Sequence, residues 1–109
     1  MTFLYFSKED LENAFREVET HYTKHEEVPD YRCETVGLGK LFGVLEKVQM
    51  DTFYPSLFDK ATYLFISINK GHFFSNGNKR LALVVGLGFL ALNQKRLRSF
   101  SREEYKNKL

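Results

Sequence analysis

The segment from His72 to Arg80, HFFSNGNKR, holds the residue types that a phosphate-transfer site needs. Gly77 permits the backbone dihedral angles of a tight turn, and Asn78 then begins a helix whose free N–H groups and macrodipole favour an anion. Lys79 and Arg80 add positive charge at the same end, and arginine can hold phosphate oxygens in a bidentate manner. His72 precedes the helix and can exchange a proton near neutral pH. The pattern predicts an anion cradle with a base beside it.

This segment resembles the motif of the Fic/Doc family, His-x-Phe-x-Asp/Glu-Gly/Ala-Asn-Gly/Lys-Arg, which is a specific signal. The matching positions are His72, Phe74, Gly77, Asn78, Lys79 and Arg80. Lys79 stands where most Fic enzymes carry glycine and is typical of the Doc (death-on-curing) branch. Leu81-Ala82-Leu83 follows, so the second arginine of the Fic motif is missing, which also indicates the Doc branch. The similarity continues upstream through 57–64 and downstream through 82–93.

The resemblance implies a role for each matching residue. His72 would be the general base that removes the proton of the target hydroxyl, and Phe74 would anchor the loop in the core. The expected nucleotide and phosphate ligands are Gly77, Asn78, Lys79 and Arg80.

Alternative roles exist for three of these residues and for Lys70. Asn78 could be only a helix cap, and Lys79 and Arg80 could be solvated surface charges. Cations are unfavourable at a helix N-terminus, and a bound phosphate would offset that cost, so we favour ligand binding. Lys70, just before the loop, either steers a nucleotide or target, or compensates the C-terminal end of its helix.

Asn76 departs from the family pattern. It occupies the position of the acidic residue that, in the family, holds Mg²⁺ against the nucleotide phosphates. An amide keeps one carbonyl ligand but lacks the negative charge that Mg²⁺ prefers. We therefore expect metal affinity and turnover to fall, whether the chain is a weakened enzyme, a non-catalytic relative or an engineered knockdown.

The Doc resemblance implies ATP and Mg²⁺ as cofactors. The reaction would transfer the γ-phosphate to a Ser or Thr hydroxyl of a protein, elongation factor Tu in the family. It also implies a toxin with a cognate antitoxin, whose disordered tail folds onto it, and a cytoplasmic location. Two alternatives remain open. AMP transfer, as in the main Fic branch, is disfavoured by the missing second arginine, and a catalytically inactive binding module is favoured by Asn76.

Composition indicates an ordinary soluble protein. The chain has 109 residues, 43% of them hydrophobic and 28% charged, which predicts a single domain over 1–109. Doc relatives continue for about one more helix, so the resemblance implies that this domain lacks the family's last helix. The single Cys33 excludes an internal disulfide and fits a reducing compartment.

Charge is divided unevenly along the chain. Residues 1–78 hold eight Lys or Arg and twelve Asp or Glu, a net charge of −4, whereas residues 79–109 hold eight and two, a net charge of +6. We assign the basic residues after 94 to a solvated surface, because the tail is short and lacks a nucleic-acid-binding motif. We therefore expect no direct nucleic-acid partner. The apolar run 81–92 is too short to cross a bilayer, which needs about 20 residues, so we expect no membrane partner.

Helical periodicity predicts an all-α bundle. A capping signal at Ser7 precedes an amphipathic helix over 7–23. A second pattern over 38–48 is interrupted by Gly37, Gly39 and Gly43, which would let neighbours approach. A third helix is expected to have Pro55 at its first position and Gly71 as its C-terminal stop.

A fourth helix is expected from Asn78 to Asn93. It is apolar nearly all round, which predicts a central helix wrapped on every side, with Gly86 and Gly88 letting a neighbouring helix come close. A basic turn over 94–100 would follow, and a capping signal at Ser101 predicts a last helix from there.

Overall fold

The computed structural model describes residues 3–22 and 27–108, with side chains described up to Gln94. Within these ranges the chain forms α-helices and one short 3-10 helix and no β-strand. The elements are α1 (Lys8–Thr20), η1 (Tyr31–Cys33), α2 (Thr35–Lys47), α3 (Leu57–Gly71) and α4 (Asn78–Lys108). The predicted all-α class is confirmed. None of the described helices has the length and apolar character that a membrane span requires.

Capping boxes begin two of the helices. Ser7 Oγ accepts a hydrogen bond from the N–H of Asp10 at 3.1 Å, and the Asp10 carboxylate accepts from the N–H of Ser7 at 2.9 Å. The predicted start of α1 is therefore confirmed within one residue, although α1 ends three residues before the predicted limit at 23. The predicted place of Pro55 was wrong. Ser56 is the N-cap of α3. Its side chain accepts from the N–H of Asp59, and the Asp59 side chain accepts from the N–H of Ser56, whereas a helix that began at Pro55 would lack this capping box.

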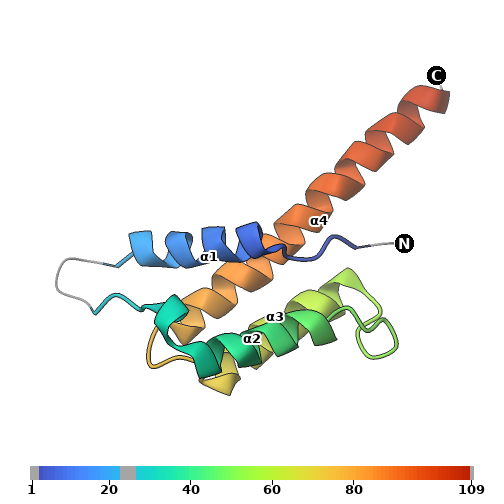
Figure 1. Ribbon diagram of the computed structural model, residues 1–109. Helices are drawn as coiled ribbons and strands as arrows, with labels where there is room; N and C mark the ends of the chain where they lie inside the picture. Colours follow the sequence, from blue (N-terminus) through green and yellow to red (C-terminus); the bar gives the residue numbers. More distant parts are fainter. Residues whose placement is uncertain (1–2, 23–26, 109) are drawn as a thin grey trace.

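The longest helix, α4, is the largest departure from expectation. It does not end at Asn93, and neither the predicted turn over 94–100 nor a new helix from Ser101 forms, because α4 continues to Lys108 (Figure 1). Residues 94–108 contain no Gly or Pro, and most of them are good helix formers. Without a residue that breaks the helix, the isolated capping signal does not start a new one.

The core is the seam where α4 packs against α3 and α1. Leu81, Val85 and Phe89 recur at helical spacing on α4 and are fully buried. The prediction that α4 is wrapped on every side was wrong, since Leu83 and Leu87 are 41% and 62% exposed. Both residues line an open groove beside α3, together with Phe58, Phe65 and Ile66. The predicted close approach at Gly86 is confirmed: a Cβ there would lie 3.4 Å from the Cβ of Phe65 on α3.

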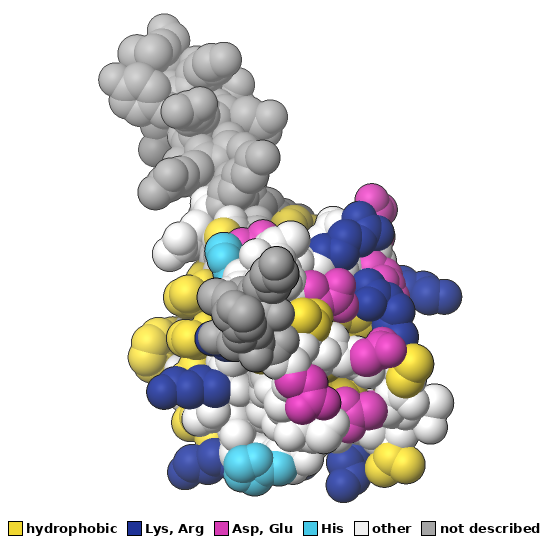
Figure 2. All heavy atoms as spheres, turned by 90° about the vertical axis from the view of Figure 1, so that its left-hand side faces the viewer, with side chains coloured by type: hydrophobic (Ala, Val, Ile, Leu, Met, Phe, Trp, Pro, Cys, Tyr) yellow, Lys and Arg dark blue, Asp and Glu magenta, His cyan; other side chains and the backbone are white. Residues whose placement is uncertain are grey.

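Charged side chains are mixed on the described surface. Figure 2 shows Asp and Glu side chains interspersed with Lys and Arg on the face toward the end of α1. The described residues of this face therefore do not form the single-sign positive surface that is typical of nucleic-acid binding.

Candidate functional site

The loop between α3 and α4 begins with a residue in an unusual backbone conformation. His72 caps α3 in the left-handed region, with φ 48° and ψ 48°. We expected Gly71 to provide this stop, and that prediction was wrong: Gly71 is the last residue of α3. A Cβ at Gly71 would collide with the ring of Phe73, so a larger residue there would force that ring to move. The left-handed conformation costs a non-glycine residue about 1–2 kcal/mol, so the loop holds His72 at a cost.

Asn78, the first residue of α4, closes the loop with its side chain. Its Oδ1 accepts from the N–H of Phe74 at 3.0 Å, and its Nδ2 donates to the C=O of Phe74 at 2.7 Å. The Phe74 side chain is 4% exposed and contacts the core. Because the Asn78 amide is used in this way, the N–H groups at the start of α4 are not capped by it. These N–H groups lie at the helix N-terminus, where an anion is favoured.

Gly77 is the turn residue before α4, with φ 75°. Its C=O accepts from the N–H of Leu81 at 3.0 Å and from the hydroxyl of Tyr31 at 2.8 Å. A Cβ at this position would collide with the Tyr31 hydroxyl and would lie 2.9 Å from Cγ of Pro29. Both the positive φ and the surrounding side chains therefore require glycine here.

Three residues support the loop from outside it; our sequence reasoning did not identify Tyr31 or Glu34, and it expected Gly37 to permit a close approach without indicating the loop as the neighbour. Tyr31, in η1, is fully buried, and its hydroxyl donates to the carbonyl of Gly77. Glu34 Oε1 accepts from both the N–H and the hydroxyl of Ser75, at 2.9 and 2.8 Å. Gly37 faces Phe73 so closely that a Cβ would collide with the backbone carbonyl of that residue. No helical periodicity marks Tyr31 or Glu34, which lie in the connector before α2.

A pocket of about 440 Å³ opens beside the N-terminus of α4. Its described lining comprises Tyr22, Glu27, Asn76, Gly77, Asn78, Lys79 and Arg80. The structure therefore brings the predicted phosphate-binding residues and the predicted metal position into one cavity. It does not bring the other two candidates there: His72 and Lys70 are exposed and do not line the pocket.

Two contacts shape the wall of this pocket. The Nδ2 of Asn76 donates to the backbone C=O of Glu27 at 2.8 Å. The guanidinium carbon of Arg80 lies 4.2 Å from the centre of the Tyr22 ring, within the range of a cation–π interaction. With its Nδ2 bonded to Glu27, Asn76 can offer a metal only its carbonyl oxygen. Among the described residues, no group of three or more His, Cys, Asp or Glu could hold a metal ion alone.

The single amide oxygen of Asn76 fits Mg²⁺ only together with phosphate oxygens. Mg²⁺ in nucleotide sites is commonly held by one or two protein ligands, the substrate phosphates and water. Asn76 would supply one neutral ligand, without the charge that a carboxylate would add.

Burial raises the pKa of Tyr31, and the charges of Tyr22 and Glu19 act in the same direction. The positive charge of Arg80 opposes them but does not outweigh them. The Tyr31 phenol therefore remains protonated at neutral pH, and its hydroxyl is a lasting donor to the Gly77 carbonyl.

Comparison with known proteins agrees with the motif. The model of the Fic/DOC family matches residues 5–90, which include α1, α2, α3, the loop and the first part of α4. No curated protein and no solved structure gave a significant match.

Proposed function

The chain belongs to the Fic/Doc family, and from this membership we propose that it is a Doc-like phosphotransferase that uses ATP and Mg²⁺. The observation that carries the proposal is the pocket at the amino end of α4, where Gly77 to Arg80 line one cavity. The backbone amides of the first helical turn, a helix dipole and two cations meet there, which is the chemistry that binds phosphate.

In this proposal the γ-phosphate of ATP occupies the cavity. His72, at the start of the loop that leads to α4, removes the proton of a protein Ser or Thr hydroxyl. The hydroxyl oxygen attacks the γ-phosphorus, the bond to the β–γ bridging oxygen breaks, and ADP leaves. Lys79, Arg80 and the backbone N–H groups stabilise charge on the transferred group. Asn76 would hold Mg²⁺ together with the phosphates, and the metal would supply charge neutralisation.

The biological setting is part of the same proposal. The target would be elongation factor Tu, the partner would be an antitoxin, and the place of action would be the cytoplasm, where translation occurs. A second candidate is an inactive binding module of the family, which Asn76 favours because a neutral ligand holds Mg²⁺ weakly. AMP transfer remains a third candidate, which the missing second arginine disfavours.

Intact-protein mass measurement of elongation factor Tu after incubation with the protein, ATP and Mg²⁺ tests the reaction. A gain of one phosphoryl group is expected, and a gain of one adenylyl group would instead indicate AMP transfer. His72→Ala should abolish the gain. If neither the wild-type protein nor Asn76→Asp modifies this target or binds ATP, the phosphotransferase proposal is wrong.

The Asn76→Asp substitution should raise the rate about tenfold or more. A carboxylate facing Mg²⁺ in a partly shielded site contributes more than about 1.4 kcal/mol, which corresponds to that factor. Asn13→Asp, the same chemical change on an exposed residue of α1, is the matched control and should leave the rate unchanged. An equal rate in Asn76→Asp and wild type would show that residue 76 does not limit metal binding.

A further inference from the structure

The carbonyl oxygen of Gly77 receives two hydrogen bonds. One comes from the N–H of Leu81 at 3.0 Å and is the first bond of α4. The other comes from the hydroxyl of Tyr31 at 2.8 Å, from an element 46 residues earlier in the chain. An N-cap carbonyl normally needs only the helical bond, so the second donor is an addition that the fold makes from outside the helix.

Peptide geometry links this carbonyl to the phosphate cradle. The described peptide bonds are all trans, so the C=O of Gly77 and the N–H of Asn78 point in opposite directions in one plane. Whatever holds the carbonyl therefore also holds the N–H. The carbonyl points to Leu81 and Tyr31, so the N–H points away from the helix body, at the end where the pocket opens.

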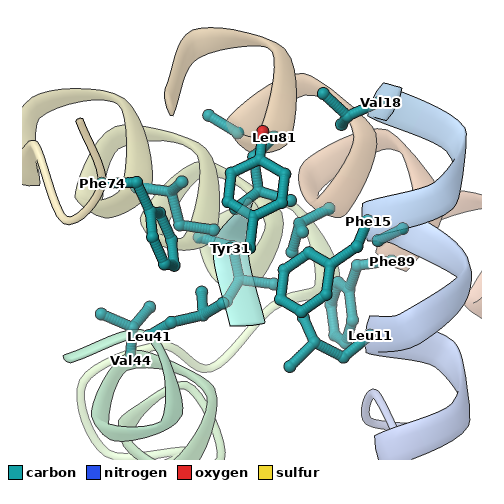
Figure 3. Close-up of a cluster of buried hydrophobic side chains, with 14 of the residues drawn as sticks. Leu11, Phe15, Val18, Tyr31, Leu41, Val44, Phe74, Leu81 and Phe89 are labelled. Carbon is teal, nitrogen blue, oxygen red and sulfur yellow. The ribbon is translucent and has the colours of Figure 1, made fainter. Parts of the chain in front are cut away.

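Tyr31 is rigid enough to act as the holding group. Its side chain is fully buried, and its ring lies between Phe15 and Phe74, as Figure 3 shows. The centre of the Tyr31 ring lies 4.8 Å from the centre of the Phe15 ring, which is stacked on it, and 4.8 Å from the centre of the Phe74 ring, which meets it edge to face. Such packing leaves the ring no alternative rotamer without opening the core. The hydroxyl is thus presented to Gly77 at a fixed place.

We infer that Tyr31 is a positioning residue for the phosphate cradle: its hydroxyl fixes the Gly77–Asn78 peptide so that the Asn78 N–H is directed at the bound anion. The identity of that anion, the phosphate of ATP, rests on the proposed function. The alignment of the N–H does not, because it follows from contacts within the protein. Tyr31 also connects the site to α1, since Phe15 lies on that helix.

The Tyr31→Phe substitution removes the hydroxyl and keeps the ring. Titration calorimetry with ATP and Mg²⁺ should show the dissociation constant rising about fivefold, the effect of losing one hydrogen bond of ordinary strength. Tyr63→Phe is the matched control, because this α3 tyrosine interacts with Ser67 and Tyr54 rather than with the loop. An unchanged dissociation constant in a folded Tyr31→Phe protein would contradict the inference.

A second measurement separates positioning from general destabilisation. The ¹⁵N and ¹H shifts and the hydrogen-exchange rate of the Asn78 amide should change in Tyr31→Phe, and remain as in wild type in Tyr63→Phe. Phe15→Leu, which weakens the packing but keeps the Tyr31 hydroxyl, should lower stability with a smaller effect on the Asn78 amide. If the Asn78 amide is unchanged in Tyr31→Phe, the inference is overturned even if ATP does not bind. Failure of the wild type to bind ATP contradicts only the proposed function.

Discussion

Individual side chains hold the loop between α3 and α4 by satisfying backbone groups that no helix covers. Asn78 bonds both the N–H and the C=O of Phe74, and Glu34 accepts both donors of Ser75. Buried or half-buried backbone groups that lose their partners cost about 1–3 kcal/mol each. The loop is therefore held by a small number of polar contacts, and a loop held in this way needs less reorganisation to bind the phosphate of the proposed function.

A different side chain holds the opposite end of α3. Lys60 is fully buried, and its Nζ donates to the C=O of Val48 and to Oδ1 of Asp51, both at 2.8 Å. It also lies 5.4 Å from the centre of the Phe3 ring. One cation therefore ties the end of α2, the turn before α3 and the N-terminal segment together.

Lys60→Met should destabilise the protein by about 1–3 kcal/mol. The substitution keeps most of the volume but leaves the Val48 carbonyl without a donor. Urea unfolding followed by circular dichroism measures the effect. Lys40→Met, at an exposed position of α2, is the control and should change the free energy of unfolding by less than about 0.5 kcal/mol. Equal stability of Lys60→Met and wild type would show that the buried ammonium contributes nothing net.

At the scale of the elements, α2 supports the site with its backbone. Its start lies against the loop, where Gly37 meets the carbonyl of Phe73. Further along the helix, Gly39 and Gly43 face open space, and a Cβ at either position would have no neighbour within 4 Å. We expected all three glycines to permit close approach, and the structure confirms this only for Gly37.

Substituting these glycines by alanine should therefore have opposite effects. Gly37→Ala should destabilise the protein by about 1–3 kcal/mol, because the methyl group collides with the loop backbone. Gly39→Ala and Gly43→Ala should stabilise it by up to about 1 kcal/mol, since alanine is the better helix former. Thermal unfolding of the three variants measures this contrast. A stabilising Gly37→Ala would mean that α2 does not press on the loop.

At the scale of the whole molecule, several buried groups hold their protons to high pH. Burial raises the pKa of Tyr31 and that of Tyr63. Burial lowers the pKa of Lys60, but hydrogen bonds with Asp51 and Tyr5 outweigh it, so the net pKa is raised. In the unfolded chain these groups titrate near about 10 to 10.4. The stability that they contribute is complete below that pH and is lost as pH rises through the folded-state values.

The free energy of unfolding should consequently fall above about pH 10. Each group that stays protonated only in the folded state adds a slope of up to about 1.4 kcal/mol per pH unit. Urea unfolding from about pH 8 to 11 measures the slope. Tyr31→Phe should reduce this slope by up to about 1.4 kcal/mol per pH unit, the contribution of one titrating group. A slope that is identical in Tyr31→Phe and wild type would show that the phenol loses its proton equally easily in both states.

The turn at Gly77 and several of the helix boundaries could be predicted from local sequence. Ser7 with Asp10, the helical spacing of apolar residues and the run from Gly77 to Arg80 act over a few residues, so they can be recognised without a fold. The prediction of a new helix at Ser101 also rested on local sequence alone, and it failed. A capping signal is only one local preference, and the helix-forming residues around it were stronger.

Tertiary packing alone decided what surrounds that turn. Tyr31, Glu34 and Gly37 meet residues 73–77 across separations of 36 to 46 positions, and no pattern along the chain reports which residues are partners in such contacts. The same packing left Leu83 and Leu87 exposed on a helix whose composition predicts burial on all sides. The sequence by itself thus determined which groups form the cradle, because amides, cations and a turn glycine are local properties. Only the tertiary structure determined the orientation of these groups, because the Gly77 carbonyl is held by the hydroxyl of Tyr31, a residue that packing brings next to it.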